Sequence, residues 1–314
     1  MKNLLSFFKG NTPATVGTII VLVFVLLSVL APWITPYDAN KRVARGHQPP
    51  SAEYIMGTTR SGKDVLSQVI YAGRISLLVG FGAGLIATII AVLVGITSAY
   101  AGGRVDAFLM FVTNVFLVMP GLPMIIVLAA FLGQVGPLSI ALILGLFGWA
   151  GGARVLRAQA LSIREKEFVT AAEVIGESKW RIVIVEMLPN MVSLIVGTFA
   201  GAALGAVMGQ AALEFIGLGD PTVISWGTML QWAQHNSALI VGAWWEAIVP
   251  GIAIALFAGG LTLFNMGMDQ VSNPQLKGSK NLKRWKVLND ELEAQRKAKQ
   301  AANKGKSHDG VMPV

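Results

Sequence analysis

Cysteine is absent and charge is scarce in this sequence, and each shortage excludes a class of function. The 314 residues include no cysteine, three histidines and only 13% charged residues. Without cysteine there is no disulfide framework, thiol catalysis or cysteine-bound metal. The histidines, at positions 47, 235 and 308, are too scattered to predict another metal site. A soluble domain carries about 25% charged residues, so the low charge points away from an ordinary soluble enzyme.

Uncharged apolar runs of membrane-spanning length recur along the chain, and 54% of its residues are hydrophobic. About 20 apolar residues in a helix cross a hydrocarbon core of roughly 30 Å. The first run has an apolar core too long for a signal peptide and no small-x-small cleavage site, so we expect it to be retained. The sequence predicts six spans, at 14–35, 76–99, 107–132, 138–159, 191–216 and 247–268.

The basic residues predict how these spans are oriented. With six spans, 19 of the 25 lysines and arginines lie on the side of the N-terminus, and the other six lie in 36–75. Cytoplasmic segments of membrane proteins carry the excess of basic residues. We therefore predict cytoplasmic termini, 1–13 and 271–314, an external loop at 36–75 and a membrane core at 76–270. The net charge of +8 then belongs to a membrane face, where it meets lipid, and not to a nucleic-acid interface.

The external loop contains GTTRSGKD, residues 57–64, which differs at one position from the phosphate-binding pattern GxxxxGK[ST]. The last residue is Asp64 where the pattern needs a hydroxyl. Two prolines shortly before it argue against the buried strand that precedes such a loop, and the predicted topology keeps it away from cytoplasmic nucleotide. We expect the glycines to shape a turn and Asp64 to cap a helix that lies along the membrane surface.

The longest cytoplasmic connection, 160–190, is predicted to form two short helices. Strong helix formers occupy 164–175, with one apolar face made of Phe168, Ala171, Ala172 and Ile175. Gly176 is expected to end this helix in a positive-φ conformation, Ser178 to begin a second one, and Pro189 to break the chain before the next span. Periodicity alone leaves open whether this amphipathic segment docks on a partner or is a simple surface connector.

Here the residues resemble a known family. Ala171-Ala172, then Gly176, then Leu188-Pro189-Asn190 is similar to the EAA loop of ABC-importer permeases. The resemblance implies that the 167–178 helix is a coupling helix that docks on a cytoplasmic ATPase. Thr170 replaces the family's first Glu, and Glu186 stands where a basic residue is common. The positions implied in ATPase coupling are Glu167, Phe168, Thr170, Ala171, Ala172, Gly176, Glu186, Leu188, Pro189 and Asn190.

Other segments are similar to the oligopeptide- and dipeptide-type permeases, namely GTTRSGKDVLSQVIYAGRISLLVG, YAGGRVDAFLMFVTNVFLVMPGLPMII, LEFIGLGDPTVISWGTML and NPQL. The first span and long external loop resemble the second, C-type permease of such systems. The resemblance implies an all-α integral membrane protein with six transmembrane helices, the type I ABC-importer permease fold, without catalytic site or cofactor. It also implies a second homologous permease, two ATPases and an external solute-binding protein as partners in a bacterial inner membrane.

The cargo implied is a di- or oligopeptide, although similar permeases carry oligosaccharides or nickel. A stand-alone channel or an intramembrane enzyme is the alternative from another class. The sequence has neither a GxSxG elbow nor paired intramembrane carboxylates, so a hydrolase is disfavoured.

The fifth predicted span carries Gly197, Gly201, Gly205 and Gly209, which are spaced four residues apart. Small residues at this spacing let membrane helices pack closely, so these glycines serve helix packing, line a translocation path, or both. Glu214 follows them, and an intramembrane carboxylate is expected to face the path or external water. Gln210 stands where the family often has an acid. The tryptophans between spans five and six predict an interfacial belt or an external lip.

Overall fold

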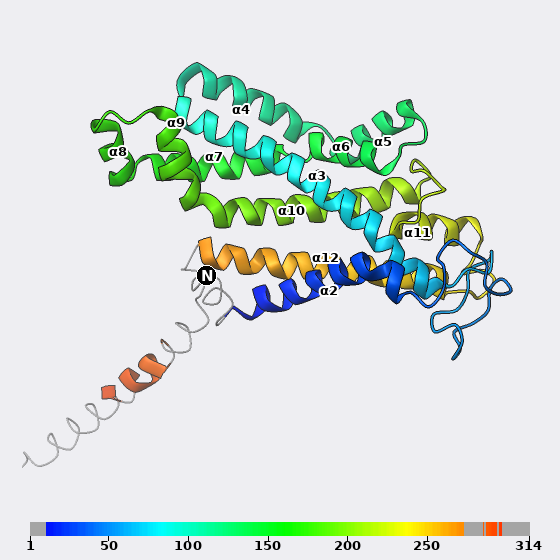
Figure 1. Ribbon diagram of the computed structural model, residues 1–314. Helices are drawn as coiled ribbons and strands as arrows, with labels where there is room; N and C mark the ends of the chain where they lie inside the picture. Colours follow the sequence, from blue (N-terminus) through cyan, green and yellow to red (C-terminus); the bar gives the residue numbers. More distant parts are fainter. Residues whose placement is uncertain (1–10, 273–284, 286, 294, 297–314) are drawn as a thin grey trace, which may run out of the picture. The chain divides into compact units, whose positions relative to one another are not determined.

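The computed structural model describes residues 11–272, 285, 287–293 and 295–296, and it divides the chain into Met1–Asp269 and Gln270–Val314. The first unit is a set of long helices that run alongside one another (Figure 1). Within the described residues the β contacts are two isolated bridges, Thr58 with Asp64 and Val135 with Gly219. In the second unit the described residues are helical. Most of the predicted terminal segments, 1–13 and 271–314, lie outside the described residues.

Four helices are each long and apolar enough to cross a membrane, and two bent pairs raise the number to six. The continuous ones are α2 (Thr12–Ile34), α3 (Val65–Ala101), α10 (Leu188–Phe215) and α12 (Trp245–Ser272). One bent pair is α4 (Gly103–Val118) with α5 (Gly121–Leu132), and the other is α6 (Pro137–Phe147) with α7 (Ala150–Arg164). The predicted all-helical fold with six spans is confirmed.

The two spans expected at 107–132 and 138–159 are both bent. The axes of α4 and α5 meet at 83°, and those of α6 and α7 at 44°. Met119 and Pro120 have extended backbones between α4 and α5, because proline cannot donate a helical hydrogen bond and restricts the residue before it. The second break lies at Gly148 and Trp149, where glycine weakens the helix.

The second span begins earlier than expected. Asp64 caps α3, accepting a hydrogen bond from the Ser67 backbone amide at 2.8 Å, as predicted. The helix then continues without interruption for 37 residues to Ala101. The separate membrane-surface helix expected before position 76 is therefore wrong. Gly73 does not break the helix, because it sits where α3 passes close to Ser28 of α2 and Trp226.

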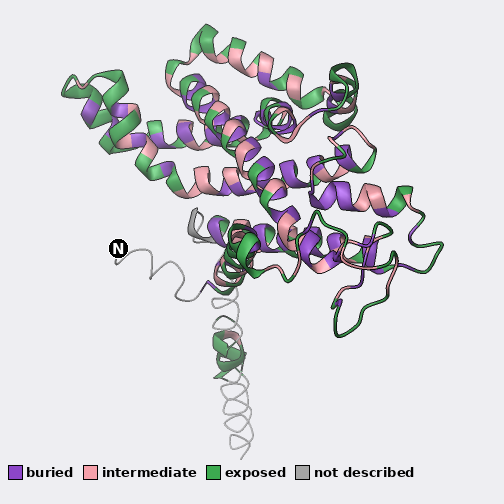
Figure 2. Ribbon diagram, turned by 45° about the vertical axis from the view of Figure 1, so that its right-hand side comes forward, coloured by how far each residue is buried: buried purple, intermediate pink, exposed green. Residues whose placement is uncertain are grey.

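Close packing around α3 organises the first unit. A Cβ on Gly84 would lie 2.9 Å from the Ala203 amide nitrogen of α10, and one on Gly95 would lie 2.6 Å from the Ala153 carbonyl of α7. Figure 2 shows buried residues gathered where the helices cross. In α4, by contrast, Thr113 is the single buried residue of the 16 that the structure describes there. Small residues on α3 thus set the distances between the spans.

The start of α2 and the C-terminal part of α12 lie at one end of the first unit, which we call the α8 end. The Asn11 side chain donates to the Gly267 carbonyl at 2.9 Å, and α8 (Glu167–Val174) lies at this same end (Figure 1). The opposite, α11 end carries α11 (Trp226–His235) and the 36–64 loop. The chain passes between the two ends six times.

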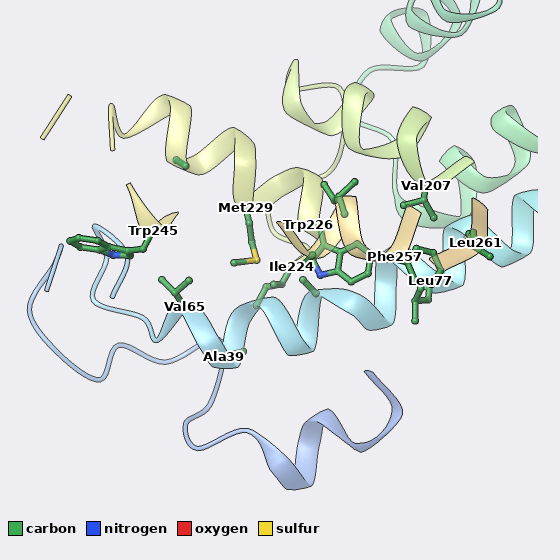
Figure 3. Close-up of a cluster of buried hydrophobic side chains, with 14 of the residues drawn as sticks. Ala39, Val65, Leu77, Val207, Ile224, Trp226, Met229, Trp245, Phe257 and Leu261 are labelled. Atoms are coloured by element: carbon green, nitrogen blue, oxygen red, sulfur yellow. The ribbon is translucent and has the colours of Figure 1, made fainter. Parts of the chain in front are cut away.

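Two of the tryptophans expected in an interfacial belt are instead buried at the α11 end. Trp226 is 1% exposed and donates its indole N–H to the Val69 carbonyl at 3.0 Å. Trp245 is 6% exposed and donates to the Thr58 carbonyl at 3.1 Å. Figure 3 shows Trp226 and Phe257 packed among side chains of α3, α10 and α12. These rings are core residues that tie the 36–64 loop and α11 to the spans.

Candidate functional site

The predicted coupling helix is α8, and it is shorter than expected. Helix α7 ends at Arg164, the backbone of Lys166 is extended, and α8 covers Glu167–Val174. Gly176 has φ +85°. Its amide donates to the Glu173 carbonyl, and the amide of Glu177 donates to the Ala172 carbonyl, both at 3.1 Å. These two hydrogen bonds form a Schellman motif, in which a positive φ favours glycine.

The expected apolar face of α8 is divided between two sides. Val169 and Ala172 are buried in a hydrophobic cluster that also contains Ile182 and Met187. Ala171 and Phe168 are exposed, and Ile175 is 78% exposed. Beside Ile175, Val174 is 82% exposed and Trp180 is 76% exposed. The structure thus corrects the predicted face: one side of α8 packs on the protein, and apolar side chains project from the other.

The segment after α8 does not break at Pro189 as expected. Ser178 begins the short helix α9 (Lys179–Arg181), its side chain accepting from the Arg181 amide at 3.4 Å. A π-helical stretch, η1 (Ile182–Met187), then leads directly into α10. Proline lacks the amide that an α-helix needs, and a π-helical stretch just before it accommodates the lost bond. The Asn190 side chain donates to the Glu186 carbonyl at 2.7 Å, so the Leu-Pro-Asn sequence stabilises this junction.

A cavity of about 490 Å³ follows the glycine face of α10 beside the bend between α6 and α7. Gly197, Gly201 and Gly205 line it, opposite Trp149 and Gly148. Among the described residues nothing lies within 4 Å of a Cβ placed on Gly205. Gly209 differs, since its Cβ would meet Leu144 of α6 at 2.8 Å. The four glycines therefore do not share one role: three border open space and the fourth packs against a helix.

Two polar residues that the sequence reasoning missed complete this wall. Asn265 and Asp269, one helical turn apart on α12, line the same cavity. The Asn265 amide lies beside Gly197 and Gly201, 3.1 and 3.7 Å from their Cβ positions. Both residues could have been recognised from the sequence, because Asn265 lies within an apolar run and Asp269 directly follows it. Polar and charged residues in such positions usually face a cavity or the bundle interior.

Glu214 does not face water or the cavity. It is 2% exposed, accepts a hydrogen bond from Gln210 Nε2 at 2.9 Å, and also accepts one from the Ser225 hydroxyl. Ser225 caps α11 through a capping box with Thr228. The carboxylate therefore joins the end of α10 to the start of α11. A buried carboxylate is tolerated when hydrogen-bond donors surround it.

Comparison with known proteins identifies this arrangement. Residues 76–278 match the family of binding-protein-dependent transport system inner membrane components, and residues 2–50 match the N-terminal TM domain of oligopeptide transport permease C. The chain belongs to the binding-protein-dependent transport permeases. The permease therefore has the fold class predicted for it, and it is a membrane subunit of the ABC-importer type.

The permease is similar to characterised sequences over most of its length. It is 31% identical to the dipeptide transport system permease protein DppC of Bacillus subtilis, over 86% of this chain and 84% of that one. It is 32% identical to the dipeptide transport system permease protein DppC of Alkalihalophilus pseudofirmus, over 86% and 88%. It is 28% identical to the oligopeptide transport system permease protein OppC of Bacillus subtilis, over 86% and 88%.

The structure separates the predicted site residues of the permease into three groups. Those of 167–190 gather at the α8 end, around α8, η1 and the start of α10. Gly197, Gly201 and Gly205 line the cavity, which α12 also borders. Gln210 and Glu214 lie at the other end of α10 in the buried contact with Ser225.

Proposed function

We propose that this permease is one of two membrane subunits of an ATP-driven importer of di- and oligopeptides. A second homologous permease completes the translocation path, two ABC ATPases bind at the α8 end, and an external solute-binding protein delivers cargo at the α11 end. ATP is hydrolysed by the partner subunits and not by this chain. The protein resides in a bacterial inner membrane with both termini in the cytoplasm.

The exposed apolar side chains around α8 are the observation that carries this proposal. Val174 and Ile175 project from the end of α8, which Val169 and Ala172 fix to the bundle, and Trp180 projects from α9. Contiguous apolar side chains that a protein leaves exposed usually mark an interaction site. Because α8 lies beyond the spans, these side chains suit a soluble partner with an apolar cleft. The ATPase is the partner that we propose.

Charge supports the orientation. The lysines and arginines outside 36–75 number 19 of 25, and in the proposed topology all of them belong to the cytoplasmic side or to the spans that end there. The positive-inside rule then places the α8 end in the cytoplasm, where ATP is available.

The cavity and the relatives support peptide cargo. A volume of about 490 Å³ falls in the range of about 300–1,000 Å³ that small ligands occupy. Its α10 wall consists mostly of small residues, three of them glycines that present backbone and no side chain, so it suits cargo whose side chains vary. The relatives named above are dipeptide and oligopeptide permeases.

A docking experiment tests the proposed coupling role. Val174→Asp and Ile175→Asp place a carboxylate in the exposed apolar patch without touching the buried side of α8. Ile240→Asp is the matched control, because Ile240 is 87% exposed at the α11 end. We expect both α8 variants to be inserted normally and to lose ATPase in co-purification, whereas the control retains it. Wild-type recovery of ATPase with both α8 variants would contradict the proposal.

The shape of α8 can be tested separately. Gly176→Val puts a β-branched residue at φ +85°, and Ala172→Trp overfills a buried contact. We expect both variants to be inserted and yet to uncouple uptake from ATP hydrolysis.

Uptake by proteoliposomes that hold the purified complex identifies the substrate class. The competing cargoes are labelled tri-alanine, a labelled maltooligosaccharide and ⁶³Ni²⁺. Peptide uptake alone is the expected result, and transport by the isolated single chain would refute the proposal.

A further inference from the structure

A polar cluster joins three spans at the α8 end, and none of the residues discussed above belongs to it. Asp106 lies in the first turn of α4 and Arg157 on α7. Arg157 Nε donates to Asp106 Oδ1 at 2.6 Å, and Nη2 donates to Oδ2 at 2.5 Å. The Ser98 hydroxyl of α3 donates to the same carboxylate and accepts from Arg157 Nε at 3.2 Å. We call Ser98, Asp106 and Arg157 the three-helix clamp.

The local sequence dictates how the clamp forms. Gly102 and Gly103, at φ +63° and +52°, reverse the chain between α3 and α4, so that Asp106 turns back toward Ser98. Gly95 lets α7 approach α3 until its Cβ position lies 3.1 Å from the Arg157 amide nitrogen. The forked guanidinium then meets the carboxylate in two parallel hydrogen bonds, an arrangement that fixes direction as well as distance.

The burial of the clamp argues that it is more than a surface ion pair. The side chains of Arg157 and Asp106 are 27% and 22% exposed, in the middle of α7 and in the first turn of α4, two helices that form parts of membrane spans. Exposed pairs contribute little because water screens them. Ionisable residues in spans are costly and usually pair with one another or serve a function. A partly buried fork between two spans resists their separation and their rotation.

The clamp continues toward α8 through a second set of contacts. Arg164, the last residue of α7, donates to the Ala99 carbonyl of α3 at 3.1 Å. Its guanidinium lies over the Tyr100 ring, 5.7 Å from the ring centroid. The Tyr100 hydroxyl reaches Glu173 of α8 at 3.5 Å. Helix α7 is therefore held to α3 at two points just before the two-residue turn that leads into α8.

We propose that Asp106 and Arg157 are positioning residues that make α7 and α8 move as one body with α3 and α4. Force applied to α8 by an ATPase then displaces the spans and is not absorbed at the turn between α7 and α8. The inference rests on the proposed coupling role of α8 and adds the element that transmits its motion. Neither Asp106 nor Arg157 is among the residues that line the cavity.

The test uses the full complex of both permeases, the ATPases and the binding protein in proteoliposomes, with labelled tri-alanine as cargo. Asp106→Asn and Arg157→Lys weaken the fork while keeping side-chain size or charge. Arg154→Lys is the matched control, because Arg154 also lies on α7 and contacts α4, but its partner is the neutral Asn114 side chain at 2.7 Å. Three quantities are measured for each variant: ATPase bound per permease, ATP hydrolysed, and peptide imported per ATP.

We expect Asp106→Asn and Arg157→Lys to bind ATPase normally and to hydrolyse ATP, while peptide imported per ATP falls roughly fivefold or more, the lower end of coupling between distant sites. Arg154→Lys keeps the wild-type ratio. A merely structural role would lower the amount of assembled complex and leave the ratio per assembled complex unchanged, which would overturn the proposal. So would a wild-type ratio in both clamp variants.

The proposed function and the three-helix clamp can be refuted separately. If wild-type complex imports no peptide, or if both Val174→Asp and Ile175→Asp retain ATPase, the proposed function fails and the clamp with it. If both of those hold and the clamp variants stay coupled, the clamp alone is refuted. Should Asp106→Asn fail to assemble, Ser98→Ala takes its place. It removes one hydroxyl from the carboxylate and leaves the fork, so the ratio should fall by less than in Arg157→Lys.

Discussion

The contact between α3 and α10 allows a stability prediction with an internal control. Gly84 and Gly82 lie two residues apart on α3, both within the helix and with ordinary helical backbones. A Cβ on Gly84 would lie 2.9–3.0 Å from three atoms of Ala203, two of them backbone atoms that cannot rotate away. A Cβ on Gly82 would have its nearest neighbour, the Ala141 Cβ, at 3.9 Å, which is ordinary contact.

The magnitude follows from comparing Gly84→Ala with Gly82→Ala. Both substitutions gain the same helix propensity, up to about 1 kcal/mol, so this gain cancels between them. What remains is the overlap at Ala203, which must be relieved by moving α3 away from α10. Overpacking of this kind costs about 1–3 kcal/mol. At roughly 2–4 °C per kcal/mol, Gly84→Ala should melt about 2–12 °C below Gly82→Ala.

The assay is thermal unfolding of the purified permease followed by the fluorescence of its eight tryptophans, at one scan rate and in one detergent. Gly84→Leu extends the series, and its melting temperature should be lower still, because a longer side chain meets the same backbone. Equal melting temperatures for the two alanine variants would refute the close approach of α3 and α10. A lower value for Gly82→Ala would refute the assignment of which glycine faces α10.

Three further predictions concern the cavity and the α11 end. Gly205→Leu should change stability by less than about 0.5 kcal/mol, as an uncrowded position allows, yet lower peptide uptake by the complex, because its side chain enters the cavity; unchanged uptake would remove this glycine from the path. Glu214→Ala should cost about 1–3 kcal/mol for each donor left unpaired, seen as earlier melting, and Ser225→Ala should also melt early, since it removes one donor to Glu214 and the cap of α11. Trp226→Phe should cost about 0.5–1.5 kcal/mol through the lost indole hydrogen bond to the Val69 carbonyl, whereas Trp244→Phe, at a residue 49% exposed, should melt like wild type.

The sequence predicted the number of spans because membrane crossing leaves a strong signal, the absence of charge over about 20 residues. It could not predict their bends. Pro120 and Gly148 both lie within one uncharged run, 107–153, and hydropathy contains no information on the direction of a helix. Nor could it show that α3 is continuous from Val65, since an apolar segment before a span reads alike whether it lies on the membrane or extends the helix.

The glycines of α10 show why spacing alone left packing and path open. A step of four residues turns about 40° around a helix of 3.6 residues per turn. Three such steps rotate Gly209 about 120° away from Gly197, so the two ends of the row face different neighbours. The structure accordingly places Gly197 beside Asn265 of α12 and Gly209 against Leu144 of α6. The spacing of the glycines predicts how the row rotates around α10, but the packing of other helices decides which residues each glycine meets.

The GTTRSGKD stretch also shows that surrounding residues decide what a sequence pattern does, because a short motif acquires its chemistry from its surroundings. Gly57 and Gly62 do adopt positive φ, +71° and +76°, as glycines of a phosphate loop often do. Here they form a tight turn beside the carbonyls of the 44–48 segment. Asp64, at the position of the Mg²⁺-binding hydroxyl, is 1% exposed and accepts from both the amide and the hydroxyl of Ser67. Its Oδ2 accepts both hydrogen bonds at the start of α3, so the residues that resemble a nucleotide loop instead fix where a membrane span begins.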